Sequence, residues 1–316
     1  MRVLTLFVLL VFSALSPALV RGGAPGGIVW PKVTEVLQGE LIELRVAGAD
    51  LAAVEGSWGK EKIFFYANGD DSFSALVGAD VEAKPMLTKL RLKATSSTGA
   101  VRESETTLKV KAKSFRRESF NVPPGFDAMT PDALEEIRRE REEFAKAFET
   151  FVTERLWEAP FIRPVPHEAS ASSFGARRII NGAPRAPHSG TDLSAPAGTE
   201  VLAANHGRVA LVGNYFFAGG SVVLDHGAGL FTMYFHLSEL RVEAGALVKK
   251  GEVLGLSGAT GRVTGAHLHW GARLTNARVE PFELLRKISP GDERHPSRNS
   301  AANKMEQSHG EKRFHP

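Results

Sequence analysis

Five side chains between residues 187 and 271 are of types that bind a metal ion or work beside one. The stretch opens with the run Pro-His-Ser-Gly-Thr-Asp, has Tyr-Phe-His-Leu-Ser in its middle and closes with Gly-Ala-His-Leu-His-Trp-Gly. The chain has no cysteine, so a transition-metal site must use His, Asp and Glu. The five candidates are His188, Asp192, His236, His267 and His269.

His267 and His269 are two positions apart. In a β-strand, residues i and i+2 point to the same face and lie about 6.5–7 Å apart along the strand. Both imidazoles are therefore expected to face one cleft, while Leu268 and Trp270 face away from it. One ring can then ligate a metal while the other reaches a substrate. Taken alone, the pair is also compatible with coincidence on a surface strand.

His188 and Asp192 are four positions apart, with the small residues Ser189 and Gly190 between them. Pro187 and Gly190 argue against a regular helix, so the pair is expected on a tight loop that curls round an ion. An imidazole with a carboxylate suits Zn²⁺, whose catalytic sites have three protein ligands and one open position. The alternative is an Asp that satisfies its own backbone in a turn.

Composition sets limits on fold and partners. The chain has 316 residues, 43% of them hydrophobic, which is enough for two domains with packed cores. Lys and Arg total 39 against 36 Asp and Glu, a net charge of +3. That excess is too small to indicate a nucleic-acid partner.

Residues 1–22 have the pattern of a secretory signal peptide. Arg2 precedes an apolar run over residues 3–20, followed by small residues and a Pro break. The alternative is an uncleaved membrane anchor, for which the run is marginal in length. We expect export to the periplasm or the extracellular space, and no membrane span after the signal is cleaved.

Residues 28–115 are predicted to form an accessory β-sandwich. Leu90 and Leu92 alternate with Lys89, Arg91 and Lys93. Period-two alternation with one charged face is typical of a half-buried antiparallel sheet. Turn signals separate the runs, and no catalytic constellation is present, so a spacer or docking role is favoured.

Residues 123–158 are predicted to be a linker followed by a helix. Thr130 can cap the helix and Pro131 suits its first position. We expect the helix to end near Trp157. Its stripe of apolar residues favours packing on a domain surface, with contact to a partner protein as the alternative. The stripe comprises Leu134, Ile137, Phe144, Phe148 and Phe151.

Residues 161–288 are predicted to form the domain that holds the metal site. Residues 161–187 look loop-like, and their length and position suggest that they cover the cleft in a latent form. Short strands ended by Gly or Asn then predict a compact, glycine-rich antiparallel β domain. Residues 290–316 are polar and are expected to be a disordered tail. The fold class is thus mostly β.

The motif runs around the five candidates resemble the lysostaphin-type zinc metallopeptidases, also called LytM-like or glycyl-glycine endopeptidases. Ser173 to Arg178 also looks like that family, and the resemblance covers about residues 174–282. It implies a duplicated-hybrid-motif fold. It also implies zinc ligands at His188, Asp192 and His269, with the non-ligand His236 and His267 flanking a zinc-bound water.

By this resemblance the chain is expected to be a zinc metallo-endopeptidase that cleaves the stem-peptide cross-links of bacterial peptidoglycan, with the zinc-bound water as nucleophile. D-Ala–diaminopimelate bonds are favoured over glycine bridges. One alternative is a non-catalytic LytM-type regulator that activates cell-wall amidases. Another is a sheet domain with a purely structural, four-ligand zinc. Arg177 and Arg178 are interpreted either as binding a wall carboxylate or as a solvated pair.

Overall fold

The computed structural model describes residues 27–122, 129–166 and 172–288. The predicted signal peptide and the predicted tail lie outside the described residues. Strands dominate the described parts, which contain two α-helices, so the prediction of a mostly β chain is confirmed. Among the described residues, neither helix is both long and apolar enough to cross a membrane.

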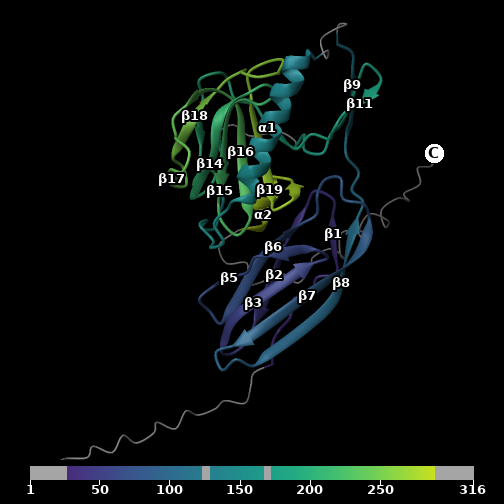
Figure 1. Cartoon of the computed structure of the whole chain (residues 1–316), viewed down its shortest axis with the longest axis vertical. Helices are drawn as coiled ribbons and strands as arrows, with labels where there is room; N and C mark the ends of the chain where they lie inside the picture. Colours follow the sequence, from purple (N-terminus) through teal and green to yellow (C-terminus); the bar gives the residue numbers. More distant parts are fainter. Residues whose placement is uncertain (1–26, 123–128, 167–171, 289–316) are drawn as a thin grey trace, which may run out of the picture.

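Two sheets form the N-terminal part, in the lower half of Figure 1. One sheet has the order β1 (Glu35–Leu37), β8 (Val101–Lys111), β7 (Met86–Ser96), β3 (Leu51–Trp58), β4 (Glu61–Ile63). The other has the order β2 (Leu41–Ala47), β6 (Ser72–Gly78), β5 (Tyr66–Ala67).

Period-two burial explains why these segments are strands. Leu90 and Leu92 of β7 are buried while Arg91 between them is exposed, as alternation predicts. Buried residues of both sheets share one hydrophobic cluster. The pairing in these two sheets is antiparallel except at one edge, where β1 runs parallel to β8. These two strands are far apart in the chain, so no hairpin turn fixes their direction.

A nine-stranded antiparallel sheet forms the C-terminal part. Its main path runs β12 (Gly190–Leu193), β19 (Leu268–Leu274), β16 (Leu230–Leu240), β15 (Gly219–Asp225), β14 (Gly207–Tyr215), β17 (Leu247–Val248). Off this path, β18 (Val253–Ser257) pairs with β16 and with β13 (Glu200–Leu202), and β20 (Ala277–Val279) pairs with β19.

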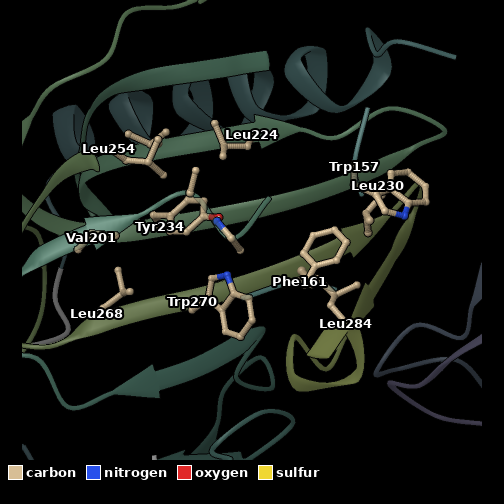
Figure 2. Close-up of a cluster of buried hydrophobic side chains, with 14 of the residues drawn as sticks. Trp157, Phe161, Val201, Leu224, Leu230, Tyr234, Leu254, Leu268, Trp270 and Leu284 are labelled. Carbon is tan, nitrogen blue, oxygen red and sulfur yellow. The ribbon is translucent and has the colours of Figure 1, made fainter. Parts of the chain in front are cut away.

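The core of this sheet is built around two aromatic side chains that point into one buried cluster, Tyr234 and Trp270 (Figure 2). They are cross-strand partners on β16 and β19. Helix α2 (Phe282–Lys287) adds Leu284 to the same cluster. Trp270 and Leu268 are fully buried, so their face of β19 is the core face, as expected.

Helix α1 (Pro131–Glu149) lies across the outer face of β14–β16 (Figure 1). Thr130 caps it by accepting a hydrogen bond from the Ala133 amide. Its aromatic stripe packs on the protein's own sheet, with Phe148 edge-on to Phe231 at 5.2 Å between ring centroids. The predicted end near Trp157 is wrong.

The chain leaves helix α1 at Glu149 because competing partners take the next backbone groups. The Val152 amide donates to the Asp225 carboxylate, and the Leu156 amide donates to the His226 carbonyl. An extended path here also lets Trp157 enter the core, where it is 2% exposed.

The prediction that residues 161–187 form a loop is wrong in part. Phe161 and Val165 are buried in the main core. Further along, β10 (Arg177–Ile180) pairs antiparallel with β11 (Ala183–Pro184) and parallel with β9 (Arg117–Phe120). Strand β9 lies just beyond the predicted first domain, and the predicted domain boundaries stay predictions. Strands β10 and β11 are the departure from the predicted loop, and the cleft-cover role of residues 161–187 stays a prediction.

Candidate metal centre

Three of the predicted side chains converge on one point. His188 Nε2 lies 3.1 Å and His269 Nδ1 lies 3.0 Å from Asp192 Oδ1. The two ring nitrogens are 2.9 Å apart. Within the described residues, this is the one group of three or more such donors whose ligand atoms lie close enough to share a metal ion, all within 4.8 Å.

Strand pairing explains this convergence. Asp192 on β12 and His269 on β19 are register partners, so their side chains stand side by side on one face of the sheet. His188 lies just before β12. Gly190 lies against the His269 ring, and a Cβ atom there would come within 2.5 Å of Nε2. A side chain at position 190 would therefore displace the ring, so glycine at this position allows the His269 ring to lie close to the backbone of β12.

The donor set fits zinc. Zinc holds imidazole nitrogen and carboxylate oxygen at about 2.0–2.2 Å, which places tetrahedral ligand atoms roughly 3.3 Å apart. The observed spacings of 2.9–3.1 Å are near that value. His188 Nδ1 donates to the Ser173 carbonyl oxygen at 3.0 Å, which leaves Nε2 free for a metal.

The protonation states also suit a cation. Burial would raise the pKa of Asp192, but hydrogen bonds and charge from His188 and His269 outweigh it and hold the pKa well below its ordinary value. Burial lowers the pKa of His269. At neutral pH the carboxylate is therefore ionised and the His269 ring is neutral, the forms that bind metal.

His236 and His267 stand beside the three donors, with 4.8 Å between their ring centroids. His236 Nδ1 donates to the Thr260 carbonyl at 3.0 Å, and His267 Nδ1 donates to the Gly265 carbonyl at 2.9 Å. In the neutral form of the His236 ring, Nε2 is then left as an acceptor. His267 Nε2 lies 3.7 Å from Asp192 Oδ1. The structure thus brings all five predicted side chains to one site.

His236 reaches this site through an unusual backbone conformation. Its φ is +67°, in the left-handed region that non-glycine residues rarely adopt, and its amide donates to the Ala218 carbonyl at 2.8 Å. Such strained residues concentrate at functional sites. Burial, together with repulsion from His269 and His267, lowers the pKa of His236 to about 4. The ring is therefore neutral near pH 7.

The family model of peptidase family M23 matches residues 186–281, which include all five side chains. Over these residues the chain is similar to peptidase family M23. The resemblance seen in the sequence is thereby confirmed.

Named relatives agree with this assignment. The chain is 46% identical over 101 residues to the peptidoglycan DD-endopeptidase ShyA of Vibrio cholerae, covering 32% of this chain and 24% of the relative. It is 41% identical over 127 residues to an uncharacterized metalloprotease of Haemophilus influenzae, covering 38% and 26%. The matches thus span only about a quarter of the length of these relatives.

One similar solved structure extends beyond the M23 domain. A Pseudomonas aeruginosa structure assigned to peptidase M23 superposes with a TM-score of 0.60 at 29% identity. The similarity covers 79% of this chain and 94% of that one. It therefore includes residues outside 186–281, so the fold around the M23 domain is shared as well.

Sequence reasoning missed several residues that support the M23 site. The Ser173 hydroxyl accepts from the Asp192 amide at 3.0 Å, and its carbonyl orients His188. Phe235 stacks on His269 with 5.4 Å between centroids and 5° between planes, and Phe144 of α1 meets Phe235 edge-on. Ser173 and Phe235 each lie in a family-like run, and Phe144 lies in the apolar stripe of the predicted helix, but none of the three was predicted to support the site. Serine and phenylalanine carry no metal signal of their own.

His226 in the M23 domain is structural, and its environment predicts a pH-dependent stability. The ring is fully buried; Nδ1 donates to the His206 carbonyl and Nε2 lies 2.7 Å from the Thr232 hydroxyl. Burial lowers the pKa of His226 from 6.5 to about 4. The unfolded chain therefore binds this proton first, so acid destabilises the fold between pH 6.5 and 4, by about 3 kcal/mol in all.

The measurement is urea unfolding at pH 7 and pH 4.5 for the wild type and His226→Gln. Glutamine keeps one donor and one acceptor but does not titrate. Between pH 7 and pH 4.5, we expect the free energy of unfolding to fall by about 2–3 kcal/mol less in the variant than in the wild type. Equal losses in both proteins would contradict the prediction.

Proposed function

We propose that this protein is an exported zinc metallo-endopeptidase that hydrolyses peptide cross-links of bacterial peptidoglycan. The observation that carries the proposal is the convergence of two imidazole nitrogens and one carboxylate oxygen in an M23 domain, with two further imidazoles beside them. A relative named as a peptidoglycan DD-endopeptidase supports the substrate class. The signal-peptide pattern of residues 1–22 supports export.

His188, Asp192 and His269 would hold the zinc ion through Nε2, Oδ1 and Nδ1. When bound, zinc supplies Lewis-acid chemistry: it polarises the scissile carbonyl and makes water nucleophilic near neutral pH. Catalytic zinc sites use three protein ligands, whereas structural sites use four. The three converging donors therefore favour a catalytic site over a structural one.

His236 and His267 would move the protons. With Nδ1 bound to a backbone carbonyl, the neutral His236 ring can take the proton of the attacking water at Nε2. It can then pass that proton to the leaving amine. His267, 23% exposed at the rim, can donate from a protonated Nε2 to the oxyanion that develops on the substrate. Together the two histidines would supply the proton transfer and the oxyanion stabilisation that peptide hydrolysis requires.

The DD-endopeptidase name of the relative favours bonds between D-configured centres, such as D-Ala–diaminopimelate, over glycine bridges. The amidase-regulator alternative is not favoured, because every donor and both flanking histidines are present in this chain. A regulator of that type does not need an intact metal site.

Digestion of purified peptidoglycan tests the proposal. We expect the protein to convert cross-linked dimeric muropeptides to monomers, EDTA to abolish the conversion, and added Zn²⁺ to restore it, because the nucleophile depends on the metal. Mass spectrometry of the products identifies the bond. Dimers that stay intact with zinc present would contradict the function.

A further inference from the structure

Arg178 is the residue of interest outside the five site side chains. It lies on β10 and is about one-third exposed. Its Nη2 lies 3.3 Å from Asp192 Oδ2, and its Nε lies 3.4 Å from Glu118 Oε2. The guanidinium therefore bridges the proposed metal ligand and a carboxylate of the neighbouring strand.

The two oxygens of Asp192 are divided between two sets of partners. Oδ1 faces His188 Nε2 and His269 Nδ1 at 3.1 and 3.0 Å, while Oδ2 faces Arg178. The terminal torsion of an Asp side chain is broad and intrinsically poorly fixed. A donor on Oδ2 removes that freedom and keeps Oδ1 turned toward the ring nitrogens.

Arg178 is itself held in place from β9. Arg178 and Glu118 are register partners in the parallel β9–β10 pair, so their side chains share one face. Glu118 also pairs with Arg116. Since β9 follows the N-terminal sheets in the chain, the bridge ties that region to the metal centre.

We propose that Arg178 is a positioning residue of the metal centre, which orients Asp192 for metal binding and is braced by Glu118. This proposal rests on the proposed zinc site, but not on cleavage of peptidoglycan. Partners of this kind on a metal ligand typically change metal affinity by about 10–100-fold when removed.

Charge alone predicts the opposite result. A guanidinium near a divalent cation repels it, so a neutral residue at position 178 would tighten binding if repulsion dominated. Glu118 offsets that repulsion, because its negative charge lies beside the same guanidinium. Orientation is then the remaining effect, and the sign of the affinity change separates the two mechanisms.

The test is Zn²⁺ affinity of the metal-free full chain, measured by chelator competition at pH 7. We expect Arg178→Gln to weaken binding by about 10–100-fold, and Arg178→Lys to recover part of the loss. Glu118→Gln is expected to weaken binding less, and the double variant no more than Arg178→Gln alone. Glu118→Gln also serves as the second probe should Arg178→Gln fail to fold.

Arg177→Gln is the matched control, and we expect its Zn²⁺ affinity to stay within about twofold of wild type. Arg177 is the adjacent arginine on β10, but its guanidinium donates to the Val81 carbonyl and lies over Phe115. Unchanged or tighter Zn²⁺ binding by Arg178→Gln would overturn the proposal. A raised KM with unchanged Zn²⁺ affinity would also overturn it, since Arg178 would then bind a substrate carboxylate. A wild type that binds Zn²⁺ but leaves muropeptides intact would refute only the peptidase function.

Discussion

Replacing His188 by alanine is expected to weaken Zn²⁺ binding by on the order of 10³-fold and to abolish cross-link hydrolysis. His188 offers one of three converging donor atoms. Zinc sites in small domains bind with roughly 10–16 kcal/mol, so one of three ligands accounts for about 4 kcal/mol. That energy corresponds to a change in Kd of about three orders of magnitude.

The measurement pairs chelator competition on metal-free protein with mass spectrometry of digested muropeptides. His206→Ala is the matched control, because the His206 ring contacts the Lys250 amide and the Glu158 carboxylate. We expect the control to bind zinc and cleave like the wild type. A His188→Ala protein that retains tight zinc binding would show that the ion is held elsewhere, and the proposed centre would fail.

The assignment of His188, Asp192 and His269 as the three donors came from the family resemblance, while strand geometry predicted only that His267 and His269 share one face. Alternation on one strand separates His269 from Leu268 and Trp270, and the structure places the latter two in the core. The prediction that His188 and Asp192 share a tight loop is wrong for Asp192, because Gly190 and Asp192 lie on strand β12. The lack of a side chain at Gly190 makes room for the His269 ring. Which of His267 and His269 lies among the donors could not be read from alternation, because both point to one side.

The position of His236 could not be predicted from alternation. Tyr234 pairs with Trp270 on the core face, and Phe235 pairs with His269 on the opposite face. Strict alternation would return His236 to the core beside Tyr234. The left-handed backbone at His236, with a register shift between β15 and β16, turns its ring to His267 instead. No propensity marks histidine for that conformation.

Non-local pairing explains the other departures from the sequence predictions. Strands β9 and β10 pair across 60 residues, Arg117 with Arg177, and such a partner leaves no periodic signal in either strand. Helix α1 stops at Glu149 because Asp225 and the His226 carbonyl, more than 70 residues away, take the following backbone amides. The local sequence pattern therefore predicts that a helix or strand is present, whereas residues far away in the chain determine where it ends.

Replacing His236 by asparagine is expected to lower kcat by about 10²–10⁴-fold while Zn²⁺ stays bound. Loss of a positioned proton-transfer group typically costs that much. The His236 ring lies beside the three donor atoms and is not one of them. Asparagine is chosen because it tolerates a positive φ better than alanine does, so the backbone bond to Ala218 is retained.

Two readouts on one protein decide this prediction: metal content after purification, and kcat against KM on dimeric muropeptides. Since His236 and His267 are proposed to act as a unit, the double variant with His267→Asn should lose little more than the more affected single variant, as is usual for coupled catalytic groups. A His236→Asn enzyme with wild-type kcat would remove the ring from proton transfer. Loss of zinc together with activity would instead make His236 a ligand, and the assignment of Asp192 and the two donor histidines would have to be redrawn around a fourth side chain.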